Sequence, residues 1–107
     1  METVTICGSM RFSQEMKEIA FMLESRYGLN VLQCTYNEQG AEITPDMLEN
    51  LEQAHFVKIS LSDWIYVVDI GHYIGDAVRK EIAYAEEHGK KVVFHSSRLY
   101  DTAVHHT

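Results

Sequence analysis

Hydrophobic and polar positions follow two alternating patterns along the chain. Short apolar runs rich in β-branched residues are typical of strands, and longer segments with an apolar residue every three or four positions are typical of helices. The expected strands are Val4–Cys7, Asn30–Cys34, Trp64–Val68 and Val92–Phe94. The expected helices cover residues 13–26, 44–61 and 76–88. The third strand is apolar throughout, which indicates a central parallel strand covered on both faces.

Local signals mark several ends of these elements. Thr44, Pro45 and Asp46 combine a helix cap, a proline at the first helical position and an acid in the first turn. Gly28 follows the first helix at the place where a glycine commonly ends one. The polar residues between 35 and 43 are expected to form a loop.

Strand–helix alternation with short connections predicts right-handed crossovers and a parallel sheet between layers of helices. The fold class is therefore α/β, with four or five parallel strands and the expected strand order 2-1-3-4. In such sheets a ligand binds beyond the carboxyl ends of the strands, where the order reverses. That place lies between the first and third strands, so the loops Gly8–Arg11 and Asp69–Gly75 should border it.

Composition limits the classes of function. At 107 residues the chain suits one domain, with a core over about 3–95 and a C-terminal tail over 96–107. Its net charge of −7 argues against binding to a nucleic-acid polymer, although one helix N-terminus and one arginine can hold a single nucleotide. No apolar run is long enough to span a membrane and the first residues do not resemble a signal peptide, so a cytoplasmic protein is expected. Cys7 and Cys34 are expected to be buried free thiols.

One carboxylate is out of place on the last helix. Ala77, Val78, Ile82 and Ala85 form its apolar side, and Glu81 falls among them. Burying a carboxylate is costly unless something pairs with it, so such a residue is often functional. An acid at the edge of the stripe that reaches water is the structural alternative. Because Glu81 lies about two turns from the helix end that faces the expected ligand crevice, we favour the functional interpretation.

The loops beside the crevice supply further candidates. After the first strand, Gly8 lets the backbone approach a ligand, Ser9 can donate a hydrogen bond and Arg11 can bind a phosphate or carboxylate. Asp69 follows the third strand and can hold a sugar hydroxyl, while Gly75 precedes a helix that can bind an anion. Ordinary turns and caps explain the same residues structurally.

The second helix is apolar on two sides, which indicates packing against the sheet and against a partner subunit. Phe21, on the polar side of the first helix, is another candidate interface residue. His55 lies in the apolar arc of the second helix, where we expect an interface role more than a place in the cleft. The six histidines show no metal-ligand spacing, and no metal is expected.

Several segments together resemble one enzyme superfamily. Cys7-Gly8-Ser9-Met10-Arg11 is similar to the corresponding turn of the 2′-deoxynucleoside 5′-phosphate N-hydrolases. Glu81-Ile82-Ala83-Tyr84-Ala85 resembles the Glu-Leu-Gly-x-Ala segment that carries the catalytic glutamate of nucleoside 2-deoxyribosyltransferases and of those hydrolases. Ser62-Asp63 before an apolar strand also matches, and the resemblance covers most of residues 3–95.

The resemblance implies a flavodoxin-like three-layer sandwich, a homodimer whose sites are completed across the interface, and no metal or organic cofactor. Glu81 would attack C1′ of the sugar as the base leaves, and water or a second base would complete the reaction. Glu81 and Asp69 are thus the candidate catalytic residues. The candidate substrate-binding residues are Cys7, Gly8, Ser9, Met10, Arg11, Gly75 and Asp76. Where the hydrolases carry a phosphate-holding serine this chain has Asp76 and Ala77, which leaves open whether the substrate is phosphorylated.

Three functions follow from these observations. The leading hypothesis is cleavage or base exchange at the N-glycosidic bond of a small nucleoside or nucleoside 5′-monophosphate. The second is a non-catalytic module that sequesters or senses a nucleotide in the same cleft. The third is a dimeric interaction protein with a degenerate pocket.

Overall fold

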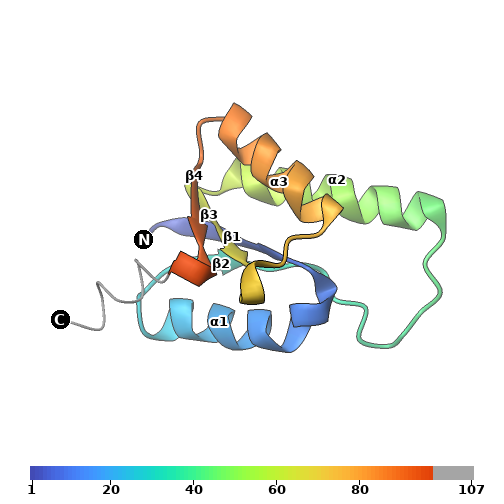
Figure 1. Cartoon of the computed structure of the whole chain (residues 1–107), viewed down its shortest axis with the longest axis horizontal. Helices are drawn as coiled ribbons and strands as arrows, with labels where there is room; N and C mark the ends of the chain where they lie inside the picture. The colour runs from blue at the N-terminus through green and yellow to red at the C-terminus, as the bar shows by residue number, and fades with distance from the viewer. Residues whose placement is uncertain (98–107) are drawn as a thin grey trace.

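The computed structural model of the chain describes residues 1–97, and strands alternate with helices along it (Figure 1). The strands are β1 (Thr3–Gly8), β2 (Asn30–Leu32), β3 (Trp64–Val68) and β4 (Lys91–Phe94). The helices are α1 (Ser13–Ser25), α2 (Pro45–Leu61) and α3 (Asp76–Glu87). Short 3-10 turns follow three of the strands: η1 (Met10–Phe12), η2 (Ile70–His72) and η3 (His95–Ser97). The tail expected from the sequence falls mainly on residues 98–107, outside the described residues.

The sheet has the predicted order and direction. Among the described residues it contains four strands in the order β2-β1-β3-β4, and every neighbouring pair is parallel. β1 and β3 lie at the centre, with Cys7 beside Val67 and Gly8 beside Val68. The carboxyl ends of β1 and β3 therefore meet at one edge of the sheet.

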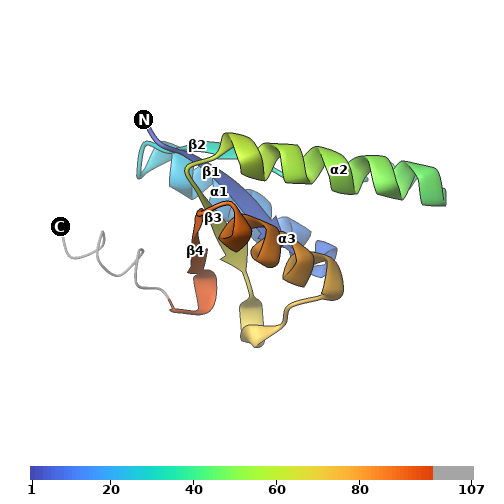
Figure 2. The same ribbon diagram turned by 90° about the horizontal axis from the view of Figure 1, so that it is seen from above.

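The helices cover the two faces of the sheet unequally. α1 lies on one face, and α2 and α3 lie together on the other, which gives the predicted flavodoxin-like three-layer sandwich (Figures 1 and 2). Because side chains alternate along a strand, β1 contributes Ile6 to the core beneath α1 and Cys7 to the core beneath α2 and α3. Cys7 thereby faces the two helices that carry the remaining site residues.

The capping signals read from the sequence are used as expected. The Thr44 hydroxyl accepts a hydrogen bond from the Met47 amide at 3.2 Å, and Pro45 begins α2. At the amino ends of β1 and β3, the Asp63 carboxylate accepts a hydrogen bond from the Thr3 amide at 2.8 Å. β2 is shorter than predicted: its pairing with β1 ends at Leu32, and the Gln33 carbonyl accepts a hydrogen bond from Lys58 Nζ instead.

α2 extends past the ends of the strands, and most of its first half is exposed (Figure 1). Leu48, Val57 and Leu61 are at least half exposed on this helix, and Phe21 on α1 is 75% exposed. These apolar surfaces agree with the reasoning that led to a homodimer, which stays a prediction. No helix within residues 1–97 has the length and apolarity needed to cross a membrane.

Gly8 is required where β1 packs against both β3 and α1. A Cβ atom at this position would lie 2.7 Å from Met16 Sδ, 3.2 Å from the Val68 carbonyl oxygen and 3.3 Å from Val68 Cβ. Val68 belongs to the neighbouring central strand and cannot move far, because interiors are close-packed. The sequence suggested that Gly8 serves a ligand, and its close contacts show that packing of the sheet against α1 also favours glycine here.

We predict that Gly8→Ala lowers the free energy of unfolding by about 1–3 kcal/mol, because the added methyl overpacks the core. Chemical denaturation measures the change. Adding Met16→Ala, which removes the nearest atom, should give a coupling energy of about 0.5 kcal/mol or more in a double-mutant cycle. Unchanged stability of Gly8→Ala would contradict the role of close packing at this position.

Candidate functional site

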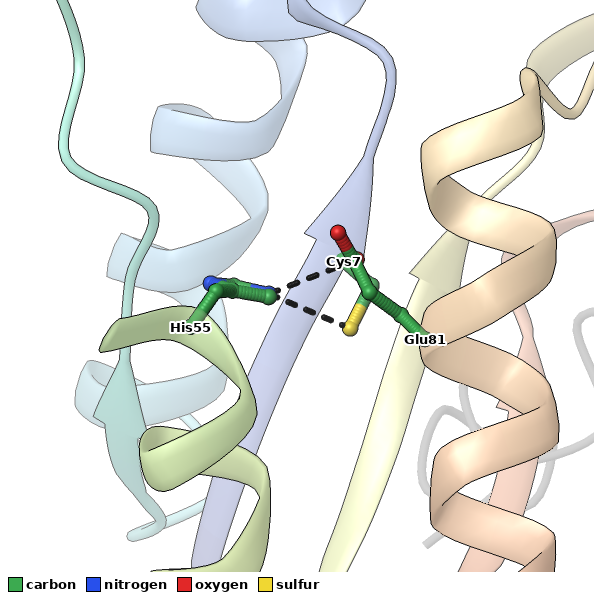
Figure 3. Close-up of side chains that lie close together, drawn as sticks. All are labelled: Cys7, His55 and Glu81. Atoms are coloured by element: carbon green, nitrogen blue, oxygen red, sulfur yellow. Dashed lines mark hydrogen bonds and ion pairs between the residues drawn. The ribbon is translucent and has the colours of Figure 1, made fainter. Parts of the chain in front are cut away.

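Three side chains from three separate elements meet above β1: Cys7 of β1, His55 of α2 and Glu81 of α3 (Figure 3). His55 Nε2 lies 3.5 Å from Cys7 Sγ and 3.4 Å from Glu81 Oε1. Both contacts are made by the same ring nitrogen. The site therefore depends on the packing of α2 beside α3 over the central strand.

Glu81 is the largely buried carboxylate that the helical pattern predicted. Only 13% of its side chain is exposed, and Val78 and Ala85 on the same side of α3 are buried. Burial raises the pKa of Glu81 from 4.5 to about 7; a hydrogen bond from Cys7 opposes the rise and the charge of Glu52 adds to it. At neutral pH the native protein thus contains both the ionised and the protonated form of this carboxyl.

His55 and Cys7 are uncharged partners of that carboxyl. Burial, with a smaller effect of the nearby Lys58 charge, lowers the pKa of His55 to about 4. His55 is therefore neutral at neutral pH, and its 3.4 Å approach to Glu81 is not an ion pair. Burial, followed by the charge of Glu81, raises the pKa of the Cys7 thiol well above its ordinary value.

This arrangement differs from a cysteine–histidine–acid catalytic triad. In such a triad the acid holds one ring nitrogen while the other faces the nucleophile. Here Cys7 and Glu81 face the same nitrogen, Nε2, so the acid does not orient the ring toward the sulfur. The Cys7 thiol is also fully buried and stays protonated, whereas a nucleophilic cysteine needs a thiolate. The carboxylate, and not the thiol, is the reactive group that this site offers.

A pocket of about 1010 Å³ opens beside Glu81 and His55. Its walls come from the turn after β1, the start of α1, the segment after β2, α2 from Leu48 to Lys58 and the start of α3. The candidate residues that line it are Gly8, Ser9, Met10, Gly75, Asp76 and Glu81. This volume is at the upper end of the roughly 300–1,000 Å³ typical of small-molecule sites.

Three of the candidate residues, Cys7, Arg11 and Asp69, do not line the pocket. Cys7 is fully buried and does not line the pocket; its thiol contacts His55. The guanidinium of Arg11 lies 3.7 Å from the centre of the Tyr73 ring, outside the pocket wall.

Asp69 is the clearest departure from expectation. Its carboxylate is buried and accepts hydrogen bonds from the Ser96 amide at 2.8 Å and the Ser96 hydroxyl at 2.7 Å. It fastens the end of β3 to the turn after β4, and it does not line the pocket. The pocket instead opens toward the segment after β2. The position of Asp69 therefore supports a structural role and gives no support to a catalytic one.

Sequence reasoning missed part of the pocket. His55 was assigned an interface role, but it is buried within the chain and faces Glu81. The position of His55 in the apolar arc of α2 was the sequence feature that could have indicated a place in the site. Lys17, Tyr36 and Lys58 also line the pocket, and the Tyr36 hydroxyl is buried with no hydrogen-bond partner among residues 1–97. Sequence periodicity could not identify these residues as part of a pocket. Tyr36 lies in an irregular segment, and the two lysines lie on helices whose pattern indicates only packing.

The cluster also contains three kinds of metal-ligand atom. Cys7 Sγ, a ring nitrogen of His55 and a carboxylate oxygen of Glu81 all lie within 4.8 Å of one another. The expectation of no metal rested on spacing along the chain. That criterion cannot detect ligands supplied by three different elements.

Comparison with known proteins adds no assignment. The chain matches no family model, no curated protein and no solved structure. The class that fold and site define is a flavodoxin-like α/β protein with a buried carboxylate at a pocket, and the resemblance to the deoxyribosyltransferase superfamily stays a hypothesis.

We predict that Glu81→Gln stabilises the protein progressively, relative to wild type, as the pH rises. The unfolded chain ionises this carboxyl near its ordinary pKa of 4.5, but the native state does so only near 7. Wild type therefore loses stability between those pH values, by about 2–4 kcal/mol in total, and the glutamine variant does not.

Urea denaturation of both proteins at pH 4 and pH 8 measures this difference, with the exposed Glu86→Gln as a matched loss of one acid from α3. If the stability difference between Glu81→Gln and wild type were the same at both pH values, the raised pKa would be wrong.

Proposed function

We propose that this protein cleaves or exchanges the N-glycosidic bond of a small nucleoside or nucleoside 5′-monophosphate, with Glu81 as the nucleophile. The observation that carries the proposal is the buried Glu81 carboxylate in the wall of a pocket large enough for such a ligand. Its second oxygen points away from His55 and Cys7, toward the carboxyl end of β1 (Figure 3). The sequence resemblance favours the same residue for the same role.

The reaction proceeds in two displacements at C1′ of the sugar. A Glu81 oxygen attacks C1′ as the C1′–N bond breaks, and the bonding electrons leave with the base, which takes a proton from solvent. The product is an ester between Glu81 and the sugar. Water then attacks C1′, loses its proton and frees the carboxylate. A second base in place of water gives base exchange.

His55 is a positioning residue in this mechanism. As a neutral imidazole it can donate its Nε2 hydrogen to Glu81 Oε1, which fixes the carboxylate and leaves the other oxygen free to attack. A protonated histidine at the same place would hold the carboxylate in an ion pair and weaken it as a nucleophile. The burial that keeps His55 neutral therefore favours the attack.

The rest of the pocket suits a nucleoside. Asp76, exposed at the start of α3, can accept hydrogen bonds from sugar hydroxyls. The Tyr36 hydroxyl is buried and has no hydrogen-bond partner in the described part of the chain, so a polar group of the ligand can satisfy it. Its ring offers a surface on which a base can stack.

One observation favours the alternative of a non-catalytic nucleotide-binding module. With a pKa of about 7, Glu81 is partly protonated at neutral pH, and a protonated carboxyl can donate a hydrogen bond to a ligand without reacting. Detection of free base separates the two functions, because only the enzyme releases it.

We predict that Glu81→Gln lowers base release from nucleosides or monophosphates by a factor on the order of 10³ or more, with ligand binding retained. Glutamine keeps the shape of the side chain but cannot form the ester. Chromatography of a substrate panel measures release, and Glu86→Gln, which removes an exposed acid of α3 outside the pocket wall, is the matched control with near wild-type rates.

A 2-fluoro-2-deoxy sugar substrate should leave a covalent adduct on Glu81, detected by intact-protein mass spectrometry and peptide mapping. Wild-type rates of release by Glu81→Gln would exclude the nucleophile assignment. Ligand binding without release from any substrate by the wild-type protein would support the binding module.

A second prediction concerns the 5′-phosphate. Lys17 is a cation of the pocket wall and forms an ion pair with Glu38, also in that wall. Lys17→Ala should weaken binding of a monophosphate about tenfold or more and change nucleoside binding little, because a phosphate contact is a charge-assisted hydrogen bond. Calorimetry measures both ligands. Arg11→Ala, outside the wall, is the control; a selective loss in Arg11→Ala alone would return the phosphate contact to Arg11.

A further inference from the structure

The Cys7–His55–Glu81 cluster has a feature that the glycosidic reaction does not use. His55 Nε2 carries either one hydrogen or one lone pair, yet both Cys7 Sγ and Glu81 Oε1 approach it. One nitrogen can therefore make at most one of the two contacts as a good hydrogen bond. Three different donor atoms are held around a common point by β1, α2 and α3 (Figure 3).

The distances match the edges of a tetrahedral zinc site. With the usual Zn–S, Zn–N and Zn–O bond lengths, a tetrahedral Zn²⁺ ion holds sulfur and nitrogen about 3.5 Å apart, and nitrogen and oxygen about 3.4 Å apart. In this protein the corresponding distances are 3.5 Å for Cys7 Sγ to His55 Nε2 and 3.4 Å for His55 Nε2 to Glu81 Oε1. The third edge, between Cys7 Sγ and a Glu81 oxygen, is at most 4.8 Å, and rotation of the Glu81 side chain can shorten it.

We propose that Cys7, His55 and Glu81 bind one thiophilic divalent cation, with Zn²⁺ as the best match, and leave its fourth position open to the pocket. His55 and Glu81 line the pocket and Cys7 lies behind them, so the open position faces the space where the nucleoside would bind. Thiolate and imidazole ligands select Zn²⁺ over Mg²⁺ and Ca²⁺, which prefer oxygen.

Charge balance supports the site. When the ion binds, the Cys7 S–H bond breaks, its proton goes to solvent and a Zn–S bond forms, while neutral His55 and ionised Glu81 donate lone pairs; nothing is oxidised or reduced. One thiolate and one carboxylate then neutralise the two charges of the ion. Two buried anions without a cation would be strongly disfavoured, so the ion and its ligands stabilise one another.

Metal binding and the proposed reaction exclude one another. A Glu81 oxygen that coordinates the ion, and an ion in the path to C1′, both prevent attack on the sugar. We therefore expect Zn²⁺ to inhibit base release and a chelator to restore it. This consequence rests on the proposed function, whereas the metal site itself does not.

The test uses the full chain, treated with a chelator and then exchanged into chelator-free buffer. Calorimetry with Zn²⁺ should give one saturable site per chain. Titration with Co²⁺ should give the intense near-ultraviolet band of a cobalt–thiolate bond. His55→Gln and Cys7→Ser should each weaken Zn²⁺ binding at least about 100-fold, and Cys7→Ser should also abolish the band.

Cys34→Ser is the matched control, because Cys34 is the other thiol of the chain and lines the same pocket. It should keep both the affinity and the band. Circular dichroism verifies the fold of each variant. If Cys7→Ser fails to fold, Glu81→Gln supplies a variant that preserves side-chain shape. Glu81→Gln should weaken Zn²⁺ binding at least about tenfold. Absence of a cobalt–thiolate band in the wild-type protein, or its loss in Cys34→Ser but not in Cys7→Ser, would overturn the site.

Base release measured in excess chelator tests the enzyme separately. Metal binding without any base release would leave the metal site standing and remove the proposed function. Base release in chelator without saturable Zn²⁺ binding would support the proposed function and remove the metal site.

Discussion

The candidate site depends on one contact, the approach of His55 Nε2 to Glu81 Oε1 across the top of β1. It brings together α2 and α3, and it places a carboxylate where burial raises its pKa to about 7. A carboxyl in that state is weakly solvated and easily brought to either protonation state. The same physical condition supports attack on a sugar, hydrogen bonding to a ligand or coordination of a cation. Which of these the protein uses is decided by what enters the pocket.

The sheet determines which residues can join that contact. The parallel register of β1 and β3 puts both carboxyl ends at one edge, and the alternation of side chains turns Cys7 toward α2 and α3. α2 extends beyond this edge, so its first half becomes a wall of the pocket. The segment after β2 forms another part of the wall and contributes Tyr36. The pocket is thus built around the end of β1 and leaves out Asp69.

Contacts with distant residues changed the interpretation of Asp69 and added a second reason for Gly8. Gly8 lines the pocket, and Met16 and Val68 also fill the space that a side chain would need. Asp69 was read as a sugar-binding acid, but Ser96 supplies hydrogen-bond donors to both of its oxygens. Val68 and Ser96 lie far away in the chain from Gly8 and Asp69. Local sequence context contains no information about such a partner.

The sequence alone determined the elements, their order in the sheet and the unusual carboxylate, because these follow from periodicity, capping residues and the handedness of crossovers. Glu81 was found for that reason: an acid in an apolar stripe is visible on a helical wheel. Only the tertiary structure decided what surrounds it. His55 and Cys7 meet Glu81 because three elements converge, and the helical wheel of one element cannot show what the next one presents. Distances between side chains on separate elements arise from packing, which is a property of the whole folded chain.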